Sequence, residues 1–146
     1  MPRSEPLQKL SRRQLETLGA VRLCQQPAKG ASLKAIASRL RVSSPSALDH
    51  LTALEKLGLV ERYRGKSRLS ARGSACLTEY QRHHRVAESL FQRVGLSPEE
   101  TCSAAREIDL ALSHATVEQL CRAEGHPKLC PHGAPIDPCD RPNPRS

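Results

Sequence analysis

The sequence has almost no aromatic residues: Tyr63, Tyr80 and Phe91 are the only three, and tryptophan is absent. A hydrophobic core must therefore be built from leucine, isoleucine, valine and alanine, which suits packed helices better than a β-sandwich. No apolar run reaches the roughly 20 residues of a membrane span, and the first residues do not form a secretory signal. We therefore expect a soluble, cytoplasmic, mainly α protein with no membrane partner.

What the chain does contain is 146 residues, six cysteines and a net charge of +8. This length can bury a core without disulfides, so the cysteines are expected to be reduced, redox-active or metal-bound. The charge is uneven, because residues 1–73 hold 15 Lys+Arg against 5 Asp+Glu and residues 74–146 hold 8 against 10. The basic first half favours a polyanion binder joined to a second module, with an ordinary basic surface as the alternative.

The first half has the element order of a winged helix-turn-helix. Apolar residues recur at helical spacing in three segments, and serine, proline and glycine residues mark the helix ends. Two short strands around a turn with Gly65 then predict a β-hairpin, the wing. The predicted helices span about 10–25, 33–40 and 45–57, and the predicted strands span 59–63 and 68–70. The residues of the third helix predicted to point inward are Ala47, Leu48, Leu51, Leu54 and Leu57.

This arrangement predicts binding to double-stranded DNA. The third helix offers side chains to the major groove, and the wing sets cations beside the flanking phosphates. The predicted DNA-contacting residues are Arg41, Ser43, Ser44, Ser46, Ala47 and His50 at the third helix, and Arg62, Arg64, Lys66 and Arg68 in the wing. A three-helix unit with a charged hairpin that binds other proteins is the alternative.

The sequence of the second half predicts helices followed by an irregular tail. A long helix is predicted over 71–91, a capped helix from 98 to about 113, and another over 116–123. Narrow seams of alanine and leucine on these helices suit a homodimer interface. Six of the last 20 residues are proline, which indicates an irregular tail. We therefore expect a winged-helix domain over 1–73, a helical dimerisation and effector domain over 74–125, and a tail over 126–146.

In this order the segments resemble the diphtheria toxin repressor family of metal-dependent bacterial transcriptional regulators, over roughly residues 10–138. The resemblance implies a winged helix, a helical dimerisation domain, operator DNA as partner and Fe²⁺ or Mn²⁺ as co-repressor, in a short form without the SH3-like domain of longer members. The segments that carry it are LKAIASRL at 33–40, SSPS at 43–46, LEKLGLV at 54–60, YRG at 63–65, LSARG at 69–73, HHRVAE at 83–88 and HPKLCPHGAPI at 126–136.

The resemblance implies a metal site at His84 and Glu88, which lie four apart on one predicted helix. Cys102 falls where some members of the family supply a further histidine. This nitrogen, oxygen and sulfur set is acceptable to Fe²⁺ or Zn²⁺ and less natural for Mn²⁺. Without the resemblance, a histidine and a glutamate at this spacing are usually an exposed helix pair.

The family's second, regulatory metal site is altered in this sequence. Asp109 stands at one ligand position of that site, but Arg13 and Arg106 stand at two others. Arginine is a permanent cation and cannot bind a metal. Either the arginines pair with Asp109, Glu107 or Glu16 in place of the metal, or the alignment is displaced by one residue.

The cysteines allow a second interpretation. Four of them lie in the acidic half, with His126 and His132 interleaved, and thiolates with imidazoles suit Zn²⁺, Fe²⁺ or an iron–sulfur cluster. The residues of this thiolate or cluster site would be Cys102, Cys121, Cys130, His132 and Cys139. A redox or iron–sulfur sensor is therefore one alternative to the metal-responsive regulator, and a helical protein-interaction module is another. Nothing in the sequence indicates an enzyme, because no nucleophile or phosphate-binding loop accompanies the His84–Glu88 pair.

Overall fold

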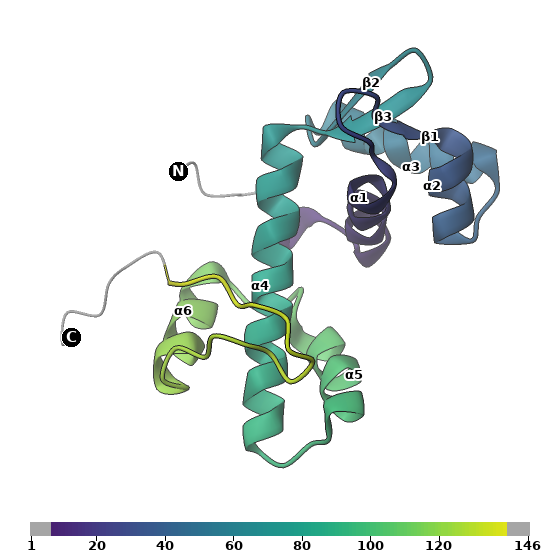
Figure 1. Ribbon diagram of the computed structural model, residues 1–146. Coiled ribbons are helices and arrows are strands. Elements are labelled where there is room, and N and C mark those ends of the chain that lie inside the picture. Colours follow the sequence, from purple (N-terminus) through teal and green to yellow (C-terminus); the bar gives the residue numbers. More distant parts are fainter. Residues whose placement is uncertain (1–6, 140–146) are drawn as a thin grey trace. The chain divides into compact units, whose positions relative to one another are not determined.

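The computed structural model describes residues 7–139 and contains mainly helices with a small three-stranded sheet (Figure 1). This confirms the predicted mainly α class. The chain divides after Thr78 into two compact units. Within the described part, no helix combines the length and the hydropathy that a membrane crossing requires.

The first unit is a winged helix. Its three helices and the first wing strand match the predicted segments, but the second strand begins two residues earlier than predicted, because Lys66 and Ser67 pair with β2 and are not in the turn. The short strand β1 was not predicted, because two residues are too few to show an alternating pattern. β1 completes an antiparallel sheet of order β1-β3-β2, with Ala31 opposite Ser67. Its elements are η1 (Leu7–Lys9), α1 (Arg12–Cys24), β1 (Ala31–Ser32), α2 (Leu33–Leu40), α3 (Ser44–Lys56), β2 (Val60–Tyr63) and β3 (Lys66–Leu69).

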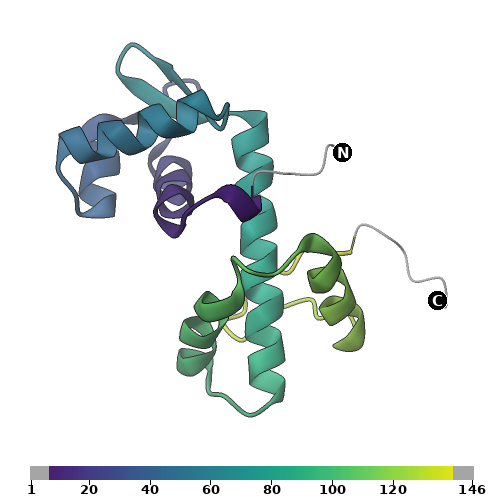
Figure 2. The ribbon, with the colours of Figure 1, turned by 180° about the vertical axis from the view of Figure 1, so that it is seen from behind.

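Serine side chains set where α2 and α3 begin. The Ser32 hydroxyl accepts a hydrogen bond from the Ala35 backbone N–H at 3.2 Å, which caps α2. Ser43 caps α3 in the same way, with proline in the first turn of that helix. Figure 2 shows α3 along its length, with the wing above it. These caps leave only a short turn between α2 and α3, as a helix-turn-helix requires.

The side of α3 that faces the core differs in part from the predicted one. Ala47, Leu51 and Leu54 are fully buried, because positions i, i+4 and i+7 of a helix share one face. The prediction that Ala47 faces DNA is therefore wrong. Leu48 and Leu57, which were predicted to point inward, are 36% and 44% exposed.

The wing leads directly into α4 (Ala71–Arg93) through a tight backbone junction. The Ser70 hydroxyl donates to the Gly58 carbonyl at 2.6 Å and accepts from the Gly73 N–H at 2.9 Å. The backbone of Gly73 lies so close to Leu59 that a Cβ added there would overlap the Leu59 carbonyl oxygen. Glycine is required here by this close approach of two backbone segments and not by helix propensity.

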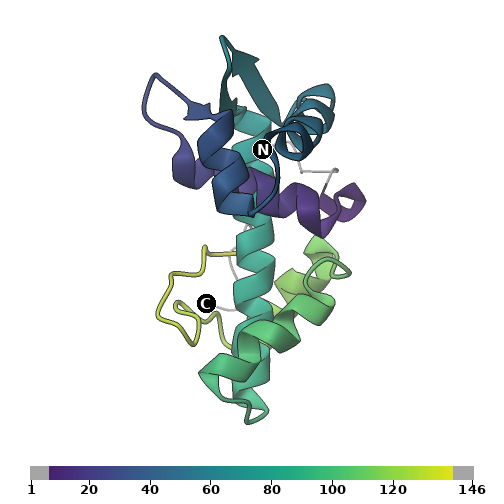
Figure 3. The same cartoon turned by 90° about the vertical axis from the view of Figure 1, so that its right-hand side faces the viewer.

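The second unit is built on the continuation of α4, with α5 (Pro98–Ile108) and α6 (His114–Ala123). The chain after α6 crosses α4 and packs against α6 (Figures 1 and 3). It forms no helix or strand in its described residues up to 139, as predicted, and residues 140–146 of the predicted tail lie outside the described part. The buried core of the unit consists of Val86, Val117, Cys121, Cys130 and Ile136.

Helix α5 ends at Ile108, about five residues before its predicted end. The Asp109 side chain is fully buried, and its carboxylate is held by Tyr80 and His84 of α4. The chain turns after Asp109, and Ser113 then caps α6. The end of α5 thus coincides with a buried polar side chain that contacts α4.

Candidate metal centre and nucleic-acid interface

The structure brings His84, Glu88 and Cys102 together. His84 and Glu88 lie one turn apart on α4, with His84 Nε2 2.7 Å from Glu88 Oε1. Cys102 reaches them from α5, with its Sγ 3.6 Å from His84 Nε2. One nitrogen, oxygen or sulfur atom from each residue lies within 4.8 Å of the other two. In a tetrahedral zinc site, a sulfur and a nitrogen ligand are about 3.5 Å apart, so the distance fits a shared ion.

Asp109 lies on the other side of the His84 ring. Its Oδ2 is 2.9 Å from His84 Nδ1 and accepts a hydrogen bond from the Tyr80 hydroxyl at 3.0 Å. When His84 Nδ1–H donates to this carboxylate, the lone pair of Nε2 points toward Glu88 and Cys102. Asp109, which the sequence suggested as a ligand, is thus not among the atoms that face the candidate ion.

The C-terminal tail supplies further donors beside Glu88. Glu88 is 3% exposed, and its second oxygen, Oε2, lies 3.2 Å from Nδ1 of His132. Cys130, which is buried, joins Glu88 and His132 in another group of potential ligands. The Cys130–Pro131–His132 motif therefore lies against the candidate metal centre.

The charge environment of this centre favours a cation. Burial, together with the nearby Glu88 carboxylate, raises the pKa of the Cys102 thiol. A divalent ion would have the opposite effect, because it favours the thiolate and compensates the buried carboxylate. The residues present fit a divalent metal, and the mixed nitrogen, oxygen and sulfur donors suit Fe²⁺ or Zn²⁺ better than Mn²⁺.

Two arginines, Arg13 and Arg106, stand where the resemblance places ligands of the family's second metal site. Arg13 Nη1 lies 3.4 Å from Glu16 Oε2, one turn away on α1, as predicted. Arg106 is exposed on α5, and the carboxylate of Asp109 is engaged by Tyr80 and His84. Arg13, which the resemblance aligns with one ligand position of the family's second metal site, thus pairs with a carboxylate of its own helix, and Asp109 is held by two side chains of α4.

The predicted thiolate site does not form as one cluster. Cys102 belongs to the His84 group and Cys130 to the His132 group, while Cys121 and Cys139 form a separate group with His126. Over residues 7–139, no group of potential ligands contains more than two cysteines. Within one described chain, a four-cysteine iron–sulfur cluster is therefore not assembled.

Sequence reasoning missed a further group of titratable residues, Glu79, His83 and His114. His83 is 1% exposed, and its burial, with His114 and Arg82 nearby, lowers its pKa to about 4. His83 is therefore neutral at neutral pH. The spacing of Glu79 and His83 on one helix was visible in the sequence, but the position of His114 depends on where α6 begins.

The predicted recognition surface is largely exposed. Ser43, Ser44 and Ser46 are exposed at the start of α3, together with Arg41 in the preceding turn, and His50 is half-buried. Short side chains at this end of the helix allow a close approach to base edges.

The wing offers three exposed cations, one of which is paired with a carboxylate. Arg64 is exposed, with its guanidinium 5.1 Å from the centre of the Tyr63 ring, and Lys66 is exposed beside it. Arg68 instead donates through Nε to Glu61 Oε2 at 2.8 Å across the two strands, so its charge is partly balanced. Arg62 is half-buried. The charge available to phosphates therefore lies mainly at the tip of the wing.

A winged helix followed by a helical unit with a metal-ligand group defines the class of metal-responsive transcriptional regulators. Two family models match in this order: the LexA DNA binding domain over residues 7–69, and the iron dependent repressor, metal binding and dimerisation domain, over residues 70–138. In both parts the chain resembles the diphtheria toxin repressor family of metal-dependent regulators, as its sequence motifs predicted. The members of this family are DNA-binding repressors and not enzymes.

Solved structures agree with this assignment. The hypothetical protein SSo2273 from Sulfolobus solfataricus is 26% identical with a TM-score of 0.81, over 88% of this chain and 99% of that one. The IdeR protein of T. acidophilum is 28% identical with a TM-score of 0.65, over 92% of this chain and 64% of that one. A manganese-dependent transcriptional repressor in complex with manganese is 27% identical with a TM-score of 0.70, over 90% of this chain and 62% of that one. This chain thus spans less than two thirds of the two regulators, and no curated protein matches it.

Proposed function

We propose that the protein is a cytoplasmic homodimeric regulator whose affinity for operator DNA depends on a divalent metal, Fe²⁺ above all, bound by His84, Glu88 and Cys102. The convergence of these three side chains from α4 and α5 carries the proposal. It is supported by the match of this part of the chain to a metal binding and dimerisation domain. The proposed division is a DNA-binding domain over 1–73, a dimerisation and metal domain over 74–125, and the tail from 126.

The residues around the ion have separate roles in this proposal. His84 is held by Asp109 so that Nε2 is free to bind, and Glu88 is held by His132. A bound ion would supply bonds that join α4 to α5. These bonds would restrict the motion of the two helices relative to each other. In a dimer, that restriction sets the spacing or rigidity of the two recognition helices, which couples metal binding to DNA affinity.

Metal dependence of DNA binding tests the proposed function. Operator sequences are first selected from a random DNA library with anaerobic, Fe²⁺-loaded protein, and affinity is then measured by fluorescence anisotropy with Fe²⁺, with Zn²⁺ and with chelator. We expect Fe²⁺ to tighten binding about 5–150-fold, the usual range of coupling between two sites. His84→Gln should abolish the effect, whereas Glu107→Gln, at an exposed position on α5, should preserve it.

Equal operator affinity with metal and with chelator would contradict metal control. Selection that yields no preferred sequence, with binding that salt fully suppresses, would instead favour the protein-interaction module.

The wing supplies a prediction about DNA contacts. Arg64→Ala should weaken binding to all sequences and reduce the salt slope of log K by about 1, because one phosphate contact is lost. Arg68→Ala is the matched variant and should change the slope less, since Glu61 already balances that charge. His50→Ala should alter sequence preference at similar salt dependence. A salt titration of each variant measures these slopes, and an unchanged slope for Arg64→Ala would remove Arg64 from the interface.

A further inference from the structure

We propose that Cys121, His126 and Cys139 form a second metal site, for Zn²⁺ or a similar soft divalent cation, that attaches the C-terminal tail to the end of α6. The Sγ, Nδ1 and Sγ atoms of these residues converge from the last turn of a helix, the turn after it and a segment 13 residues further on. The site is separate from the His84 centre and does not depend on the function proposed for that centre.

The end of α6 places His126 beside Cys121. The His126 N–H donates to the Cys121 carbonyl at 2.8 Å and the Gly125 N–H donates to the Arg122 carbonyl at 3.0 Å, which is a Schellman motif. The two outer positions of this motif usually hold apolar side chains in contact. Here they hold a thiol and an imidazole, and Cys121 Sγ lies 3.8 Å from His126 Nδ1.

His126 itself has a left-handed backbone, with φ of +57°. A residue other than glycine rarely adopts this conformation, and it has a free-energy cost of order 1 kcal/mol. Such strain is retained when the surrounding structure requires the side chain at that place. A ligand role for the imidazole is a reason for histidine at this position.

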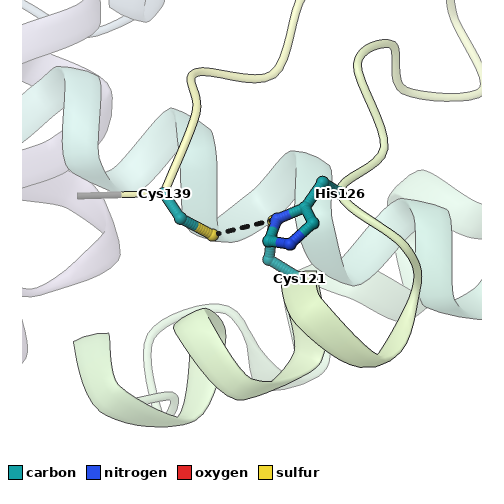
Figure 4. Close-up of side chains that lie close together, drawn as sticks. All are labelled: Cys121, His126 and Cys139. Carbon is teal, nitrogen blue, oxygen red and sulfur yellow. Dashed lines mark hydrogen bonds between the residues drawn. The ribbon is translucent and has the colours of Figure 1, made fainter. Parts of the chain in front are cut away.

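Cys139 is brought to the same point by Arg82 of α4. The guanidinium donates through Nε to the Asp137 carbonyl at 3.0 Å and through Nη2 to Cys139 Sγ at 3.4 Å. Cys139 Sγ then lies 3.5 Å from His126 Nδ1, and Figure 4 shows these two side chains meeting near Cys121. The third donor thus comes from a segment, residues 126–139, that has no helix or strand to hold it.

The distances match tetrahedral zinc. Zn–S bonds of about 2.3 Å and Zn–N bonds of about 2.0 Å place sulfur and nitrogen ligands about 3.5 Å apart. The two sulfur–nitrogen distances here are 3.5 and 3.8 Å. Two thiolates and one imidazole are soft donors that select Zn²⁺ over Mn²⁺ or Mg²⁺. A fourth position is left for water or for a neighbouring carboxylate.

The charges around this group also balance. A divalent ion with two thiolates is neutral, and binding it releases the two thiol protons to solvent. The adjacent buried charges, Arg82 and Glu118, form their own pair, with Nη1 and Oε1 2.8 Å apart. Burial, with the neighbouring Cys121 thiol and Glu118 carboxylate, raises the pKa of the Cys139 thiol to about 12, so a bound divalent ion would have to displace this proton. Loading the site therefore leaves no uncompensated charge in this part of the unit.

Two measurements test this inference together: the number of zinc ions bound per chain, and the protection of the tail from amide hydrogen exchange. The full-length protein is reduced, stripped with chelator and titrated anaerobically with Zn²⁺ against a chromophoric indicator, and amide hydrogen exchange of residues 126–139 is followed. We expect two tight equivalents per chain, and slower exchange in the tail when zinc is bound. His126→Ala and Cys139→Ser should each lose one equivalent and the protection of the tail. His126 is not part of the buried core, so His126→Ala tests the site without removing core packing.

Two further variants make the result specific. Cys102→Ser should lose the other equivalent and keep the tail protected, whereas Cys24→Ser, in α1, should lose neither. Unchanged zinc binding in both His126→Ala and Cys139→Ser would overturn the inference. So would a Cys121–Cys139 disulfide in anaerobically purified protein with no zinc bound. The proposed metal control of DNA binding depends on His84 and not on His126. A failure to find zinc at Cys121, His126 and Cys139 would therefore not contradict the proposed function, and a failure of the proposed function would not contradict this zinc site.

Discussion

Asp109→Asn is expected to weaken divalent-metal binding at His84, Glu88 and Cys102 about 10–100-fold, although it removes no ligand. The Asp109 carboxylate holds His84 Nδ1 at 2.9 Å and directs Nε2 toward the other two donors. Asparagine can still accept that hydrogen bond through its oxygen but has no charge to raise the basicity of the imidazole. Competition with a chromophoric chelator, using Fe²⁺ and Co²⁺ under anaerobic conditions, measures the loss.

Two variants separate this positioning role from direct ligation. Tyr80→Phe removes one hydrogen bond from the same carboxylate and should weaken binding less than Asp109→Asn. In the Co²⁺ form, the sulfur-to-cobalt charge-transfer band should persist in Asp109→Asn. The same band should lose the contribution of the Cys102 sulfur in Cys102→Ser. Metal affinity equal to that of the unchanged protein would show that Asp109 has no part in the site. Loss of an oxygen ligand from the cobalt spectrum of Asp109→Asn would show that Asp109 binds the ion directly.

Gly73→Ala is expected to destabilise the winged-helix unit by about 3 kcal/mol or more. The added Cβ overlaps the Leu59 carbonyl oxygen, and that oxygen also accepts a hydrogen bond from the Ser70 N–H at 3.1 Å. The atoms that the added Cβ meets belong to the Leu59 backbone and not to a flexible side chain, so the junction between the wing and α4 must shift. Urea unfolding followed by circular dichroism gives the free energy of unfolding.

The matched control for this change is Gly19→Ala, in α1. A Cβ at Gly19 meets nothing within 4 Å, so the better helix propensity of alanine should stabilise α1 by about 1 kcal/mol. The two substitutions are chemically identical, and their effects on the free energy of unfolding should have opposite signs. If Gly73→Ala were as stable as the unchanged protein, the close approach at Leu59 would not exist in solution.

This junction also matters for function. Leu59 and Val60 open the wing, while Gly73 lies in the first turn of α4, the helix that further along carries His84 and Glu88. Under the proposed function, a metal on α4 and the DNA at the wing share a coupling free energy. The dense backbone contacts at Ser70 and Gly73 fix where the wing joins the first turn of α4.

Local sequence determined much of the first unit. Serine caps, helical spacing of leucines and a glycine turn act within a few residues of each other, so the three helices and the wing could be placed before any tertiary contact was known. The asymmetry of charge and the spacing of His84 and Glu88 are equally local. The charge and the order of elements indicated DNA binding, whereas the metal and the family were implied by the resemblance of the sequence motifs.

Only the tertiary structure decided how distant residues combine. The Asp109 carboxylate meets Tyr80 and His84 at the end of α5, and the inward direction of Ala47 depends on the packing of α3. The cysteines divide into separate groups because the tail is attached to α4 by Arg82. These contacts join residues far apart in the chain through buried polar groups, and sequence spacing carries no information about which of those groups will meet.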